Sequence, residues 1–120
     1  MSTVTIREIL ANRPLHHVAP GTSLRDAAAM MAAHHVGALV VLDQGRLAGI
    51  LSERDIVFRA VATDLPPRDT VVGDVMTRDP VVLQIDAPVS QALVQKLGEA
   101  FRHLPVVDQE AVVGILSYRH

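Results

Sequence analysis

The chain of 120 residues contains no cysteine, no tryptophan, one tyrosine and two phenylalanines. Without cysteine there is no disulfide framework, no thiolate zinc site and no thiol nucleophile, which is typical of proteins from a reducing compartment. The scarcity of aromatic side chains removes the stacking platforms used to bind single-stranded nucleic acid. A formal net charge of −2 offers no basic surface to a duplex. We therefore expect no nucleic-acid partner.

Long apolar runs and targeting segments are missing as well. No run approaches the about 20 apolar residues of a membrane-spanning helix. The first five residues, Met-Ser-Thr-Val-Thr, lack the basic and then apolar pattern of a signal peptide. We expect a cytoplasmic protein with no membrane partner.

Recognisable catalytic motifs are also absent. The sequence contains no Gly-x-Ser-x-Gly elbow, no His-Glu-x-x-His pair and no P-loop. Asp55 is able to act as a base in principle, but no nucleophile accompanies it. We expect a protein that is not an enzyme and has no obligatory cofactor.

The chain repeats itself at a spacing of 65 residues. Gly49-Ile50-Leu51-Ser52 returns as Gly114-Ile115-Leu116-Ser117, and nine of the sixteen positions from 39 to 54 are identical to their partners. Self-similarity at a fixed period indicates a repeat architecture. We define a first copy (residues 1–62), a linker (63–70) that contains two prolines, and a second copy (71–120).

Each copy is predicted to form strand, helix, strand, strand and helix, preceded by a short helical turn. The turns are expected at 4–13 and 71–80, where Pro14 and Pro80 match at an offset of 66, and the first strands are expected at 15–18 and 81–85. Hairpins follow at 39–51 and 104–116, each around a short polar turn. The helix from about 22 buries Leu24, Ala27, Ala28, Met31 and His35, and the helix from Ser52 to about Ala62 buries Ile56, Val57, Ala60 and Val61.

The predicted fold class is α/β (α+β). Because about 60 residues is marginal for an independent core, we expect the two copies to be related by a pseudo-twofold and packed sheet to sheet. The second copy stops at His120, so its final helix is expected to be lacking and its apolar sheet face to be covered by another chain or by residues beyond this sequence.

Three features of the repeat resemble one known family. They are Asp74-Val75-Met76-Thr77-x-x-Pro80, Leu104-Pro105-Val106-Val107-Asp108, and Gly49-Ile50-Leu51-Ser52-Glu53-Arg54-Asp55. The chain resembles a tandem pair of cystathionine-β-synthase (CBS) domains, which is called a Bateman module. The resemblance implies a regulatory module that binds an adenosine-containing ligand, AMP, ADP, ATP or S-adenosylmethionine, in the cleft between the copies. It also implies a homodimer and a protein target that the sequence does not identify.

The resemblance assigns roles to named residues. Ser52 and Asp55 would hold the ribose, because a carboxylate accepts hydrogen bonds from both ribose hydroxyls. Thr77, Val81 and Val82 would form the base pocket. Basic groups for the phosphate would be Arg102 and His103, with Arg54 as a weaker candidate.

The corresponding second site is weaker in the sequence. Its ribose pair would be Ser117 and His120, and an imidazole cannot accept from two hydroxyls as a carboxylate can. The positions that match Arg102 and His103 are Gly37 and Ala38, which carry no charge. We expect at most one good nucleotide site per chain.

Other interpretations of the same residues stay open. Ser52 and Asp55 also have the spacing of a helix capping box, and Arg102 and His103 are also compatible with an exposed strand start. The whole fold is also compatible with a ligand-free dimerisation or docking scaffold. The six histidines are most simply surface or packing residues, with zinc bridging of His pairs as an alternative.

Overall fold

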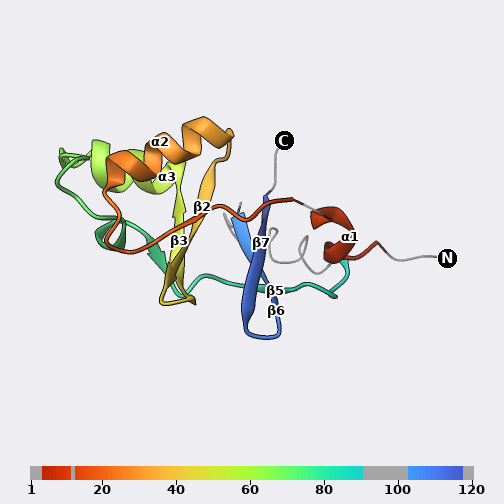
Figure 1. Cartoon of the computed structure of the whole chain (residues 1–120). Helices are drawn as coiled ribbons and strands as arrows, with labels where there is room; N and C mark the ends of the chain where they lie inside the picture. The colour runs from red at the N-terminus through yellow and green to blue at the C-terminus, as the bar shows by residue number, and fades with distance from the viewer. Residues whose placement is uncertain (1–3, 12, 91–102, 118–120) are drawn as a thin grey trace. The chain divides into compact units, whose positions relative to one another are not determined.

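The structure is a computed structural model that describes residues 4–11, 13–90 and 103–117 (Figure 1). Its helices are α1 (Ile6–Leu10), α2 (Leu24–His34) and α3 (Glu53–Asp55), with a π-helix at Ile56–Val61 and a 3₁₀ turn at Val72–Asp74. Its strands are β1 (His17–Val18), β2 (Ala38–Asp43), β3 (Arg46–Ser52), β4 (Thr77–Arg78), β5 (Leu83–Gln84), β6 (His103–Asp108) and β7 (Ala111–Ser117). The fold is mixed α+β with two sheets, as predicted.

The chain divides into two compact units, each with one sheet. The central unit comprises His16–Pro80, and the terminal unit comprises Met1–Leu15 together with Val81–His120. The central sheet has the order β1-β2-β3-β4, with β1 parallel to β2 and the other pairs antiparallel. The terminal sheet has the order β5-β6-β7, in which β5 is parallel to β6 and β6 is antiparallel to β7.

The two hairpins confirm the repeat residue by residue. Ala38 pairs with Ser52 in the central sheet, and His103 pairs with Ser117 at the equivalent place in the terminal sheet. Both ladders shift register after the fourth pair, between Val41 and Leu42 and between Val106 and Val107. The first hairpin turns through Gln44 and Gly45, whose φ angles of 52° and 80° fit the primed turns that match strand twist.

The segment that precedes the first strand of each copy, which we call its exchanged segment, packs in the unit that contains the sheet of the other copy. In the terminal unit, the N–H groups of Ile6 and Arg7 donate to the carbonyl oxygens of Ala87 and Ile85, at 3.1 and 2.9 Å. In the central unit, Val72 and Gly73 donate in the same way to Thr22 and Pro20, at 2.8 and 2.9 Å. The copies in the sequence and the compact units of the structure are therefore different divisions of the chain.

A surface ion pair also connects α1 to Asp86 within the terminal unit. The Arg7 guanidinium makes two contacts with Asp86, at 2.9 and 3.2 Å. This hydrogen bonding holds the pKa of the Asp86 carboxyl below its ordinary value. Both side chains are exposed, so the pair contributes little to stability.

Each unit has its own aliphatic core. The central core combines α2, the inner strands and the exchanged segment; its buried members are Val18, Leu24, Ala27, Met31, Leu39, Val41, Leu51, Ala60, Val72, Val75 and Met76. The terminal core contains Ile6 and Leu10 of α1 with Leu83, Leu104, Val106 and Leu116. Fully burying such side chains stabilises the fold by about 1.5–3 kcal/mol each, so the exchanged segments belong to the cores that they join.

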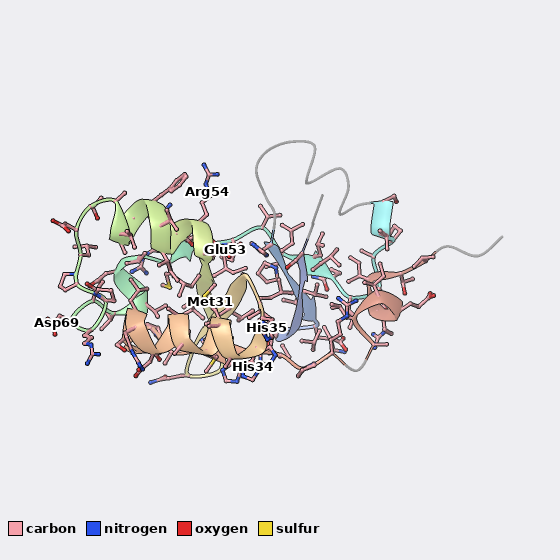
Figure 2. The ribbon with its side chains drawn as sticks, turned by 90° about the horizontal axis from the view of Figure 1, so that it is seen from above. Met31, His34, His35, Glu53, Arg54 and Asp69 are labelled. Carbon is pink, nitrogen blue, oxygen red and sulfur yellow. The ribbon has the colours of Figure 1, made fainter. Side chains whose placement is uncertain are left out.

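Two sequence expectations about helices are wrong in detail. His35 is exposed and ends α2 in the left-handed conformation, with φ of 55°, so it is a C-cap and not a core residue (Figure 2). After Asp55 the backbone forms a π-helix, in which Ala60 is buried but Val57 and Val61 are exposed. The wider turn changes the angle between successive side chains and takes both valines away from the predicted apolar face. The first helix of the second copy, which the repeat predicts at about 89–101, lies largely outside the described residues.

Candidate functional site

The candidate site begins where β3 ends and α3 starts. Ser52 has an extended backbone, with φ of −111° and ψ of 161°, and it is the N-cap of α3. The Asp55 N–H donates to Ser52 Oγ at 3.1 Å, and the Ser52 N–H donates to Asp55 Oδ2 at 3.1 Å. The capping box predicted from the sequence is therefore confirmed. It holds both side chains in one fixed arrangement.

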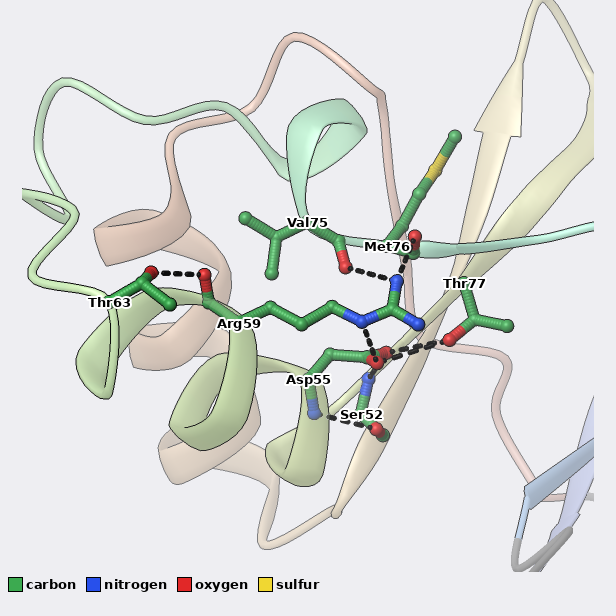
Figure 3. A network of polar contacts seen from close by, with 7 residues as sticks. All are labelled: Ser52, Asp55, Arg59, Thr63, Val75, Met76 and Thr77. Carbon is green, nitrogen blue, oxygen red and sulfur yellow. Dashed lines mark hydrogen bonds and ion pairs between the residues drawn. The ribbon is translucent and has the colours of Figure 1, made fainter.

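Thr77 joins this pair from β4. Its hydroxyl lies 3.1 Å from Asp55 Oδ1 and 3.3 Å from Oδ2, which places the donor between the two carboxylate oxygens (Figure 3). Asp55 is only 6% exposed, and Ser52 and Thr77 are half-buried. The structure thus brings together three of the residues predicted for the ligand site.

Arg59 is the member of the site that the sequence analysis did not identify. Its Nε lies 3.7 Å from Asp55 Oδ1, and its Nη1 donates to the carbonyl oxygens of Val75 and Met76 at 3.3 and 3.2 Å (Figure 3). The i,i+4 spacing from Asp55 was the available signal, since side chains at that spacing are neighbours on a helix.

Gly49 allows the strand that carries Thr77 to reach the site. β4 pairs with β3 through Gly49 opposite Arg78 and Ile50 opposite Thr77. A Cβ on Gly49 would stand 2.5 Å from the Thr77 carbonyl oxygen and 3.0 Å from the Met76 sulfur. Only a glycine permits this close backbone approach. A two-residue strand at 77–78 was not expected from the sequence.

The arrangement leaves accepting capacity on the Asp55 carboxylate. A carboxylate offers about four lone-pair positions, and the donors Ser52 N–H and Thr77 O–H occupy about two of them. Thr77 also keeps free lone pairs on its hydroxyl, because its one proton is directed at Asp55. The site is suited to a ligand that presents hydroxyl donors to a negative, sheltered acceptor.

The other residues predicted for the ligand belong to α3 or to the terminal unit. Arg54 is exposed on α3, with its guanidinium 4.5 Å from the centre of the Phe58 ring (Figure 2). Val81 packs against the core of the terminal unit, and Val82 is exposed in that unit. His103 also belongs to the terminal unit, and Arg102 lies outside the described residues.

The second copy differs at the equivalent positions. Ser117 Oγ lies 2.8 Å from His103 Nδ1, whereas Ser52 faces Ala38 at the same place in the ladder. The residue that matches Thr77 is Ala11, 66 positions earlier, which has no hydroxyl. His120, the match to Asp55, lies outside the described residues. The donor and acceptor set of the central unit is thus not repeated by these residue types.

Two of the histidines, His16 and His34, form a stacked pair. The rings of His16 and His34 stack with centroids 4.0 Å apart and planes 22° apart. Partial burial, and secondarily the neighbouring His34, lower the pKa of His16 from its ordinary value. Within residues 4–11, 13–90 and 103–117 no three His, Asp or Glu side chains are grouped to hold a metal ion. No helix of the described part is long and apolar enough to cross a membrane.

Sequence comparison identifies relatives over most of the chain. A curated CBS domain-containing protein of Arabidopsis thaliana is 35% identical over 114 residues, which cover 94% of this chain and 21% of the relative. The chain spans 18% to 21% of the length of four such Arabidopsis proteins. The activities of those longer proteins are therefore not transferred to it.

Solved structures of similar chains share the fold. A CBS-domain containing protein from Agrobacterium tumefaciens has a TM-score of 0.86 at 33% identity, covering 95% of this chain and 93% of its own. A CBS domain protein from Pyrobaculum aerophilum complexed with AMP has a TM-score of 0.85 at 28% identity, covering 95% of this chain and 87% of its own. The family model of the CBS domain matches residues 6–62 and 72–120. The chain therefore belongs to the CBS domain family, of which it carries two copies.

Proposed function

We propose that this chain is a non-catalytic regulatory module that binds an adenosine-containing ligand through Ser52, Asp55 and Thr77 of the central unit. The observation that carries the proposal is the sheltered Asp55 carboxylate, which is held by Ser52 and Thr77 and keeps accepting capacity. The AMP bound by the similar Pyrobaculum aerophilum protein supports this class of ligand. Candidates are AMP, ADP, ATP and S-adenosylmethionine.

A ribose fits the chemistry of this carboxylate. Its two neighbouring hydroxyls are donors, and hydrogen bonds to an ionised acceptor are stronger than those between neutral groups. The Thr77 hydroxyl, whose proton points to Asp55, accepts a further hydrogen bond from the ligand. Arg54, Arg102 and His103 remain proposed contacts for a phosphate, and Val81 and Val82 remain proposed contacts for the base.

Regulation requires that the ligand distinguish two states of the module. A ligand shifts an equilibrium only by the difference between its affinities for the two states. We propose that the bound nucleotide favours one orientation of the two copies, or one dimer geometry, which a protein partner then reads.

The test is a thermal-shift panel with AMP, ADP, ATP, S-adenosylmethionine, NAD and zinc. A ligand at 100 times its dissociation constant stabilises the folded state by about 2.7 kcal/mol, which raises the melting temperature by several degrees. We expect one adenosine ligand to raise it in the wild type and not in Asp55→Ala. Asp69→Ala, an exposed linker carboxylate, is the matched control and should retain the shift.

A second candidate function is a ligand-free dimerisation or docking scaffold. The observation that favours it is the apolar surface of the π-helix, where Val57, Phe58 and Val61 are 49%, 56% and 63% exposed. Asp55, Ser52 and Thr77 would then serve only the stability of the central unit. A panel without any shift, combined with a dimeric mass in light scattering, would favour the scaffold over the nucleotide module.

A further inference from the structure

We propose that Arg59 is a positioning residue for the ribose-binding carboxylate of Asp55. Arg59 would act without touching the ligand, by fixing Asp55 and the segment that delivers Thr77 relative to each other. This inference rests on the proposed function of Ser52, Asp55 and Thr77. It adds to that function the residue on which the discrimination of a ribose depends.

The geometry gives Arg59 three anchoring points on two elements. Its Nε faces Asp55 Oδ1 at 3.7 Å, at the end of α3. Its Nη1 donates to the Val75 and Met76 carbonyl oxygens, at 3.3 and 3.2 Å, directly before β4 begins at Thr77. The planar guanidinium presents several donors in one rigid fork, so it can hold a carboxylate and two carbonyls together where a lysine ammonium cannot do so equally well.

The surroundings of Asp55 favour a cation at this place. The Asp55 side chain is 8% exposed, and a buried carboxylate without a partner carries a large desolvation cost. Its two hydrogen-bond donors, Ser52 N–H and Thr77 O–H, are both neutral. The nearby Arg54 is placed over the Phe58 ring, and the structure gives it no contact with Asp55. Arg59 thus supplies the positive charge that faces the buried carboxylate within the described residues.

The backbone around Arg59 is consistent with a specialised role. The chain leaves the α-helical pattern directly after Asp55, and Ala62 and Leu65 donate five residues back, to Val57 and Ala60, each at 2.9 Å. Such π-helical distortions are rare and occur frequently at functional sites. Here the distorted segment carries Arg59 and keeps Ala60 in the core.

The test measures ribose discrimination in the whole chain. Dissociation constants for AMP and 2′-deoxy-AMP are determined by calorimetry for the wild type, Arg59→Ala, Arg59→Gln and Arg59→Lys. A lost hydrogen bond to a charged acceptor weakens binding by about tenfold or more, so the wild type should prefer AMP by at least that factor. In Arg59→Ala and Arg59→Gln the preference should fall to within about threefold, and Arg59→Lys should restore part of it. Arg68→Ala, an exposed arginine in the linker, is the control and should keep the wild-type ratio.

The outcomes separate this inference from the function on which it rests. An unchanged ratio in Arg59→Ala or Arg59→Gln, with both nucleotides weakened equally, would mean that Arg59 serves only stability and would overturn the inference alone. A wild type that binds AMP without any ribose preference would overturn the assignment of Asp55 to the ribose, and the inference with it. If Arg59→Ala does not fold, Arg59→Gln and Arg59→Lys decide the same question.

Discussion

Asp55 connects three parts of the central unit through one carboxylate. Ser52 reaches it through the capping box, Arg59 from the π-helix, and Thr77 from a strand 22 residues away. A capping residue alone contributes about 1 kcal/mol to a helix. Because Thr77 and Arg59 add to the cap, Asp55 should matter more to this fold than an ordinary capping residue does.

Thr77→Val should destabilise the central unit by about 1–3 kcal/mol, because the buried carboxylate loses a hydrogen-bond donor. In an Asp55→Asn background the same substitution should cost less, since the charged acceptor is already gone. Chemical denaturation of the two single variants and the double variant gives the coupling energy. Strict additivity would show that the hydroxyl and the carboxylate do not interact in solution. Thr63→Val, whose hydroxyl donates to the Arg59 carbonyl, serves as the control for removing a hydroxyl.

His16 should make the stability depend on pH. Its pKa is lowered in the folded state, first by burial and then by His34, so the folded protein holds this proton less tightly than the unfolded chain does. The contribution of neutral His16 to the free energy of unfolding is therefore complete above a pH of about 6.5. It is lost as the pH falls through the lower pKa of the folded state.

The expected result is a melting temperature that declines below pH of about 6.5 and declines less in His34→Asn. His17→Asn, at an exposed neighbour, should leave the pH profile unchanged. Melting curves recorded across this range for the three proteins check the sign. A profile for His34→Asn that coincides with the wild type would contradict the role of the stacked pair.

At the scale of elements, β4 is a short strand with a large effect on the site. It has two residues, yet it places Thr77 beside Asp55. Its approach to β3 depends on Gly49, where an added Cβ would meet backbone. At the equivalent residue of the second copy, Gly114, an added Cβ would stand 3.0 Å from the Leu10 side chain. The same residue type thus has a rigid neighbour in one unit and a flexible one in the other.

Gly49→Ala should therefore destabilise the protein more than Gly114→Ala does. The first substitution must displace the β4 backbone, at a cost of about 1–3 kcal/mol or more, whereas Leu10 can adjust its rotamer. Gly49→Ala should also abolish nucleotide binding, because Thr77 moves from Asp55. Denaturation midpoints and calorimetry with AMP provide both readouts. Equal losses for the two variants would contradict this difference between the units.

For the whole molecule, the apolar surface of the π-helix is the feature most typical of a protein interface. Val57, Phe58 and Val61 are large, exposed and adjacent, and Arg54 covers only one face of the Phe58 ring. Exposed clusters of this kind commonly mark protein interfaces. We propose that they contribute to a homodimer, the assembly expected from the family resemblance.

Light scattering coupled to size exclusion should give a dimeric mass for the wild type, and Phe58→Glu should shift the population toward monomer. A charge introduced at the centre of an apolar interface is desolvated without a partner, so association weakens. Glu110→Lys, an exposed charge change on the second hairpin, should not alter the mass. A strictly monomeric wild type would exclude this dimer.

The local parts of the fold were readable from the sequence because the interactions that form them join residues close in the chain. The first hairpin follows from two apolar runs around Gln44 and Gly45, and the capping box follows from the spacing of Ser52 and Asp55. The offset of 65 residues predicted equivalent ladders, and the pairs Ala38–Ser52 and His103–Ser117 are equivalent.

Tertiary structure alone decided the contacts between distant segments. No local pattern shows that α1 completes the terminal core or that Gly49 allows the close approach of β4. Nor does one show that Arg59 donates hydrogen bonds to the carbonyl oxygens of Val75 and Met76. The π-helix escaped prediction for the same reason, because the apolar spacing of Ile56, Val57 and Ala60 fits an ordinary helix. Such features depend on which surfaces meet after folding, and that is set by packing and by the pairing of buried polar groups. The sequence by itself therefore determined the family, the repeat and the cap, whereas tertiary structure decided which side chains surround Asp55.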